Sequence, residues 1–73
     1  MKKDDNYIVF IEVHKNGNME RWFYAVCDNY NTANKTAFEL SEHRRVGIFY
    51  RICKVSDASK YNINNIPDYV KEM

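Results

Sequence analysis

Glycine and proline are scarce in this chain, whose 73 residues include two glycines and one proline. A phosphate-binding loop requires several glycines at fixed spacing, so the sequence excludes that kind of nucleotide site. Cysteine is scarce as well, and Cys27 and Cys53 lack the short spacing of paired zinc ligands. His14 and His43 are separated just as widely. We therefore expect no metal ion and no cofactor.

Catalytic groups are also lacking. A nucleophilic cysteine needs a histidine within hydrogen-bond reach. Both cysteines fall late in strands that we expect at the outer edges of one sheet, whereas both histidines are expected at its opposite end. The two outer strands would lie about 9–10 Å apart, which is beyond the reach of a disulfide. We expect a non-enzymatic protein with two reduced thiols.

A net charge of one sign is absent too: eleven basic and ten acidic residues leave a charge of +1. No overall field would steer the chain to nucleic acid or to an anionic membrane. The apolar run Tyr7–Val13 ends at His14, too early for a transmembrane helix, and no signal-peptide cleavage pattern follows it. These features predict a cytoplasmic protein without a membrane partner.

Aromatic residues, by contrast, are abundant, at 15% of the chain. Each ring can bury about 150–250 Å². A chain this short forms one domain over residues 1–73 and buries only about 60% of its unfolded surface. We expect residues 1–6 to be frayed and residues 56–73 to form a C-terminal loop with a short helix. Either the core consists largely of rings, or some rings face a partner.

Two strands are predicted over residues 7–14 and 20–27, which are rich in β-branched and aromatic side chains. Asn16 and Gly17 between them favour a two-residue type I′ turn. A three-residue loop would shift the register by one position. The two-residue turn places these pairs opposite each other: Lys15 and Asn18, His14 and Met19, Glu12 and Arg21, Phe10 and Phe23, Ile8 and Ala25.

A helix is predicted over residues 30–44, with Asn29 or Asn31 as its N-cap and small alanines on its buried stripe. The basic residues 43–45 would lie in its last turn, where positive charge suits the helix dipole, and Gly47 just past its end.

A third strand follows over residues 48–55. Residues 56–65 are polar and are expected to form a loop. Pro67 suits the first turn of a short helix that spans residues 68–73.

These elements predict an α+β fold with a three-stranded antiparallel sheet in the order 2-1-3. The crossover rule places the third strand parallel to the second, and the most apolar strand occupies the centre. The resulting ββαβ arrangement is similar in shape to half of a ferredoxin-like split β-α-β fold, which carries no function. The helix is expected to cover one face, formed by Tyr7, Val9, Ile11, Val13, Trp22, Tyr24 and Val26.

The opposite face is the candidate interaction surface. Three hypotheses compete for it: cover by the C-terminal segment through Tyr61, Ile63, Ile66, Tyr69 and Val70, contact with a protein, or stacking of single-stranded nucleic acid on phenylalanines. The candidate residues are Ile8, Phe10, Glu12, Arg21, Phe23, Phe49 and Arg51.

The sequence therefore predicts a small interaction domain that binds a protein partner or itself, as a homodimer, through this face. The alternative is a single-stranded nucleic-acid-binding module that uses the exposed aromatics of the sheet. Nine asparagines and seven lysines, against two glycines and one proline, suggest an AT-rich genome. Short, aromatic-rich domains of this kind are typical of bacterial or phage accessory proteins, and an inhibitor-like role would fit. No motif identifies the partner.

Overall fold

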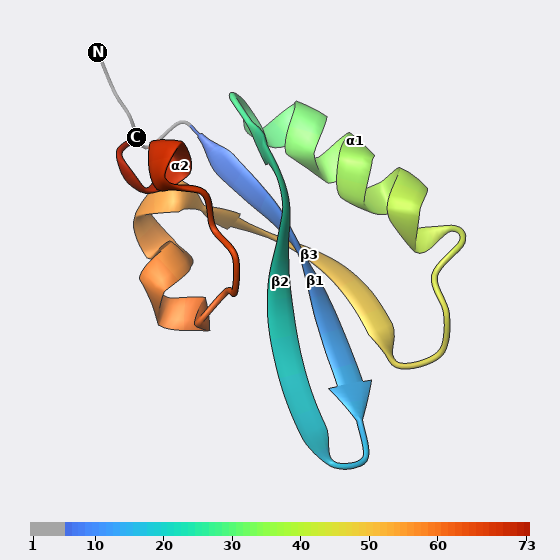
Figure 1. Cartoon of the computed structure of the whole chain (residues 1–73). Helices are drawn as coiled ribbons and strands as arrows, with labels where there is room; N and C mark the ends of the chain where they lie inside the picture. Colours follow the sequence, from blue (N-terminus) through green and yellow to red (C-terminus); the bar gives the residue numbers. More distant parts are fainter. Residues whose placement is uncertain (1–5) are drawn as a thin grey trace.

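The computed structural model describes residues 6–73, so residues 1–5, on which most of the expected fraying falls, lie outside the described residues. The sheet order is β2-β1-β3 and both pairings are antiparallel, which confirms the predicted α+β fold (Figure 1). The elements are β1 (Tyr7–Lys15), β2 (Asn18–Cys27), α1 (Tyr30–Ser41), β3 (Ile48–Lys54), the 3₁₀ helix η1 (Val55–Tyr61) and α2 (Asp68–Lys71).

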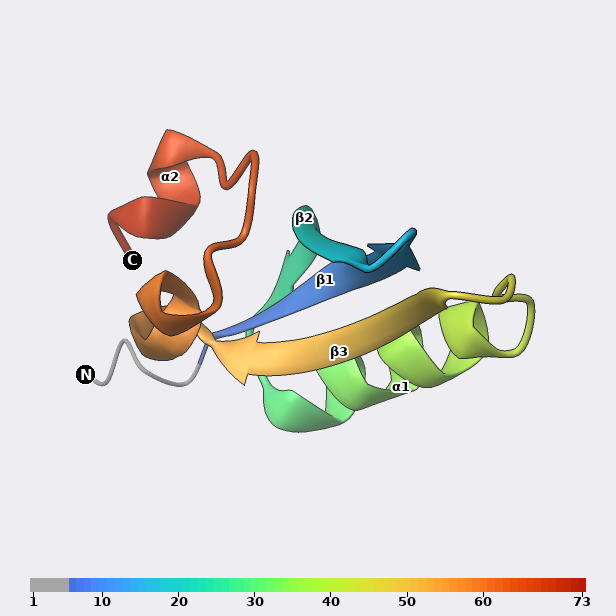
Figure 2. The same ribbon diagram turned by 90° about the horizontal axis from the view of Figure 1, so that it is seen from below.

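The sheet is covered on both faces. Helix α1 lies on one face, and the C-terminal segment with η1 and α2 lies on the other (Figure 2). On the α1 side, Val9 packs against Ala33 and Ala37, because small side chains on the helix let it approach the sheet closely. On the other side, Phe10 packs with Val70 and further apolar groups. The chain thus has a thin core on each side of β1.

The β1–β2 hairpin follows the predicted register from the turn as far as Phe10. Both turn residues have positive φ, 54° at Asn16 and 81° at Gly17, as a two-residue turn of the type I′ class requires. Beyond Phe10 the register shifts, because Tyr24 is an extra residue on β2 and forms a β-bulge.

The bulge corrects two predictions. Ile8 lies opposite Val26 and not opposite Ala25. Val26 also turns to the face away from α1, where it packs against the second core, while Cys27 packs on the α1 side. A single inserted residue reverses the faces of all later positions in a strand.

Helix α1 begins as predicted and ends earlier. The Asn29 side chain accepts a hydrogen bond from the Thr32 N–H, so Asn29 is the N-cap. The helix stops at Ser41, so the basic residues 43–45 lie in the following loop and not in its last turn. The Arg44 side chain donates to the Ile48 carbonyl across that loop.

Gly47 joins this loop to β3 and has a φ of 86°. Its carbonyl accepts a hydrogen bond of 2.7 Å from the His14 N–H. A Cβ atom at this position would lie 2.8 Å from the His14 carbonyl oxygen, so glycine is required both by its backbone conformation and by the close approach of β1.

Residues 56–65, expected to form a polar loop, contain most of η1 instead. Ala58 of η1 is buried against the sheet. Asn62 and Asn65 have positive φ, and they turn the chain after η1 so that it returns along β2. Helix α2 follows Pro67 and buries Val70 completely.

Candidate functional site

The predicted interaction face lies largely beneath the C-terminal segment. Phe10 is 1% exposed and Ile8 is 0% exposed, and both belong to the core that contains Val70. Phe23 is half-buried against the same core. The structure thus shows the first of the three arrangements considered for this face, and the surface expected to be open is closed over these residues.

The residues that form the cover are mostly those predicted. Tyr61, Ile63 and Ile66 pack against the core, and the Tyr61 ring lies 5.5 Å from the Phe10 ring between centroids. Tyr69 is the exception, since it is 60% exposed and does not cover the face. Stacking of nucleic-acid bases on Phe10 would require this segment to move away.

The remaining predicted residues form a charged cluster at the rim of the cover. Glu12 is 4% exposed, and its carboxylate accepts hydrogen bonds of 2.9 Å from Arg21 Nε and from Arg51 Nε. His14 Nε2 lies 2.9 Å from the same carboxylate. The contact with His14, followed by those with Arg51 and Arg21, lowers the pKa of Glu12 from 4.5 to about 2, against the opposing effect of burial.

Phe49 lies beside this cluster and is surrounded by cations. The Arg44 guanidinium lies 4.7 Å from the centre of the Phe49 ring, and that of Arg51 lies 5.6 Å from it. The His14 ring meets the same ring edge-on at 5.4 Å. The aromatic face of Phe49 is therefore already occupied by side chains of the chain itself.

The outer edge of β2 is closed by the C-terminal segment. The Phe23 N–H donates to the Asn64 carbonyl over 2.9 Å, and the Asn64 N–H donates to the Arg21 carbonyl over 2.8 Å. These bonds form a parallel bridge in which Asn64 extends the sheet by one short contact. Together with the bulge at Tyr24, they remove β2 as a regular pairing edge.

The outer edge of β3 has no such cover among residues 6–73, where β3 pairs with β1 alone. The Gly47 carbonyl accepts from His14 of β1, and the Val55 N–H donates to the carbonyl of Asn6, the residue just before β1. Because backbone groups alternate along an antiparallel strand, the odd-numbered residues of β3 face β1 and the even-numbered ones face outward.

Three of the outward residues carry backbone groups that have no hydrogen-bond partner among residues 6–73. These are the N–H and C=O of Tyr50 and Ile52 and the N–H of Lys54; we call this set the β3 edge. Ile48 does not belong to it, since its N–H donates to the Arg45 carbonyl and its carbonyl accepts from Arg44. Lys54 precedes η1, so its carbonyl turns toward that helix.

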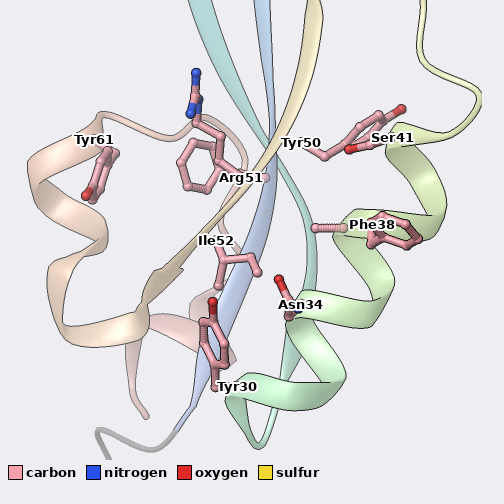
Figure 3. Close-up of a pocket in the computed structure, with 10 residues that line it drawn as sticks. Tyr30, Asn34, Phe38, Ser41, Tyr50, Arg51, Ile52 and Tyr61 are labelled. Atoms are coloured by element: carbon pink, nitrogen blue, oxygen red, sulfur yellow. The ribbon is translucent and has the colours of Figure 1, made fainter.

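A groove of about 510 Å³ runs along the β3 edge. Tyr30, Asn34, Phe38 and Ser41 of α1 form one wall, and Arg51 and Tyr61 lie on the other side of the strand (Figure 3). Among the residues that line it, Arg51 alone carries a charge. Phe38 is 64% exposed and Tyr30 is 52% exposed, so the α1 wall presents aromatic surface to solvent.

This combination distinguishes the β3 edge from the rest of the surface. Natural sheets protect their edges with charges, prolines, bulges or covering segments. The centre of β3 is regular, and its α1 wall carries no charge at the lining positions. An uncharged aromatic wall beside unpaired backbone donors and acceptors can hold an extended segment by hydrogen bonds and contact its side chains.

Sequence reasoning did not identify this edge. A strand order of 2-1-3 already implies that strands 2 and 3 lie at the edges, but the cover of β2 by Asn64 depends on the path of the C-terminal segment. The available signal was in α1: Phe38 and Tyr30 lie off the alanine stripe and so point away from the core.

The thiol, imidazole and carboxyl groups among residues 6–73 form no further candidate site. Cys27 and Cys53 are both free, and burial, with a smaller effect from Asp57, raises the pKa of the Cys53 thiol to about 11. Within residues 6–73, no three His, Cys, Asp or Glu side chains are placed to hold a metal ion together. None of the described helices is long and apolar enough to cross a membrane.

No protein-family model matches the chain, and the comparisons with curated proteins and with solved structures also found no match. A function can therefore be inferred only from the surfaces described above.

Proposed function

We propose that this chain is a non-enzymatic protein-interaction domain that binds an extended strand at the β3 edge. The observation that carries the proposal is the row of outward backbone groups on Tyr50 and Ile52 beside the exposed aromatic wall of α1. Strand addition obtains its affinity from backbone hydrogen bonds and its specificity from side-chain contacts in neighbouring grooves. The proposed binding site is thus the β3 edge and not the sheet face predicted from the sequence. The proposed function, protein interaction, is the one that the sequence predicted.

The state of the cysteines bears on the cellular compartment of the protein. Free cysteines support a reducing compartment, and we place the domain in the cytoplasm. An accessory or inhibitor-like role in a bacterium or a phage would suit a domain that acts by occupying the edge of another protein.

The nucleic-acid alternative is less well supported by the arrangement of the aromatics. It needs Phe10, Phe23 and Phe49 to be accessible together. Phe10 is 1% exposed, and the Phe49 ring is in contact with Arg44 and Arg51. The proposal therefore predicts that single-stranded DNA and RNA bind no more tightly than expected for a nearly neutral surface.

Site-specific photo-cross-linking tests the proposal. A photoreactive phenylalanine analogue replaces Phe38 in the groove wall or, as a matched control, Tyr69, which is 60% exposed on α2. We expect adducts in cells from position 38 and not from position 69, either with another protein or with the chain itself. Equal yields from the two positions, or none from either, would contradict a binding site at the β3 edge.

A further inference from the structure

We infer that the strand bound at the β3 edge is β3 of a second copy, which gives a two-fold dimer with a continuous six-stranded sheet. This inference rests on the proposed function and specifies its partner. The reasons are the symmetry of the open backbone groups, the charges along β3 and the uncharged wall of α1.

The open backbone groups complement themselves about Ile52. In an antiparallel pair centred there, the two Ile52 residues exchange N–H···O=C bonds reciprocally. The Lys54 N–H of each copy then meets the Tyr50 carbonyl of the other. Four intermolecular hydrogen bonds form in this register, two between the Ile52 residues and two from the Lys54 N–H groups to the Tyr50 carbonyls. The Tyr50 N–H faces Lys54 of the other copy, whose carbonyl turns toward η1, and no group already bonded within the copy has to be released.

Neighbouring registers are worse for reasons visible in the chain. A pair centred on Arg51 would set two guanidinium groups directly opposite each other, where like charges are destabilising. A pair centred on Tyr50 would set Ile52 opposite Ile48, whose N–H and carbonyl already bond to Arg45 and Arg44. In the register centred on Ile52, Arg51 lies opposite Cys53, which is neutral.

The walls of the two grooves also match. A two-fold axis perpendicular to the sheet keeps both α1 helices on the same face and sets them antiparallel across the seam. The residues brought toward each other are Tyr30, Asn34, Phe38 and Ser41, which are uncharged. The centres of protein interfaces are depleted of charge and enriched in aromatic residues. Phe38, 64% exposed in one copy, would be covered in the pair.

A proline at position 54 is expected to disrupt this dimer without disturbing the fold of the single copy. Lys54 has a φ of −69°, which proline adopts without strain, and its N–H faces outward. Lys54→Pro therefore removes an intermolecular donor and leaves the β1–β3 pairing intact. Lys54→Ala keeps the N–H and is the matched control, because it changes the side chain alone.

Analytical ultracentrifugation over a concentration series measures the result. We expect wild type and Lys54→Ala to reach twice the 8.8 kDa chain mass at the same concentrations. Lys54→Pro should weaken association at least tenfold with an unchanged circular dichroism spectrum. Should Lys54→Pro fold poorly, Phe38→Glu tests the same seam, with Tyr69→Glu as its control at a similarly exposed position.

Amide hydrogen exchange identifies the surface that pairs. In the dimer, the N–H of Ile52 becomes protected as the protein is concentrated, whereas in Lys54→Pro it exchanges rapidly at every concentration. A wild type that stays monomeric at millimolar concentration overturns the inference. So does a dimer in which the Ile52 amide remains unprotected or which Lys54→Pro and Phe38→Glu leave unchanged.

Failure of the inference and failure of the proposed function give different results. A monomeric wild type whose position 38 cross-links to another protein loses the dimer and retains strand binding at the β3 edge. A monomer without adducts at position 38 loses both.

Discussion

Arg21 and Glu12 lie directly opposite each other on neighbouring strands, and Arg21 Nε donates to Glu12 Oε2 over 2.9 Å. The same guanidinium donates through Nη1 to the Tyr61 carbonyl, also over 2.9 Å. Its ring contact with Tyr61, 5.5 Å to the centroid, adds a cation–π interaction. The buried carboxylate thus orients the arginine that ties the end of η1 to the sheet.

Glu12→Gln is expected to lower the free energy of unfolding at pH 7 by on the order of 2 kcal/mol, since hydrogen bonds to charged groups are lost. The pKa of Glu12 falls from 4.5 to about 2 on folding, so the folded protein binds this proton less readily than the unfolded chain. Its stabilising contribution is therefore complete above about pH 4.5 and is lost as the pH falls toward 2.

Urea denaturation between pH 7 and pH 2.5 measures this contribution. Wild type should lose stability over the acid part of that range, and Glu12→Gln should lose less. Glu39→Gln, on the exposed side of α1, is the control and should track wild type within about 0.5 kcal/mol. A Glu12→Gln protein with the same acid profile as wild type would show that the cluster does not hold the carboxylate ionised.

Val70→Ala is expected to destabilise the fold by roughly 2 kcal/mol, because it leaves a cavity in the core beneath the C-terminal segment. Val70 is 0% exposed, whereas its neighbour Tyr69 is 60% exposed. Tyr69→Ala should change the free energy of unfolding by about 0.5 kcal/mol or less. Thermal denaturation followed by circular dichroism compares the two; similar effects would mean that α2 does not dock on Phe10 as described.

The two glycines allow a matched pair of substitutions. Gly17→Ala and Gly47→Ala both place a side chain at positive φ, 81° and 86°, which costs about 1–2 kcal/mol. A Cβ at position 17 would have no atom of residues 6–73 within 4 Å, but one at position 47 would lie 2.8 Å from the His14 carbonyl oxygen. Gly47→Ala should therefore cost a further 1–3 kcal/mol, roughly. Equal losses in chemical denaturation would exclude the close approach at Gly47.

Cys53 is expected to be nearly inert toward thiol reagents in the folded protein. It is buried, and its pKa is raised to about 11, so little thiolate forms at pH 8. Cys27 is half-buried and should react first. Maleimide labelling followed by peptide mass spectrometry distinguishes the two, with complete labelling of both in urea as the control. Preferential labelling of Cys53 under native conditions would contradict the described packing.

Much of the fold could be predicted from local patterns. The Asn16-Gly17 turn fixed the register of the adjoining pairs, and handedness with apolar content gave the order of the strands. The bulge at Tyr24 could not be predicted in this way, because both possible registers keep apolar side chains on each face near Ala25 and Val26. The predicted helix ran past Ser41 because residues 42–45 have reasonable helix propensity and no proline or glycine.

The site depended on tertiary placement. The charged pair Glu12 and Arg21 was predicted from the register, and Arg51 was predicted on the same face. The polar composition of residues 56–65 predicted a loop, which hid the fact that η1 and Asn64 return to the sheet. Which strand edge remains accessible follows from that return path, and no local pattern encodes it.

The bridge at Asn64 limits how far strand pairing can extend. Sheets with two regular edges can add copies at both sides and grow into filaments. Here the β2 side is occupied by the chain's own C-terminal residues, so a copy that joins at β3 presents an already occupied strand on its far side. In the proposed dimer, this bridge would disfavour further strand addition at the β2 side, so the assembly would stop at two copies.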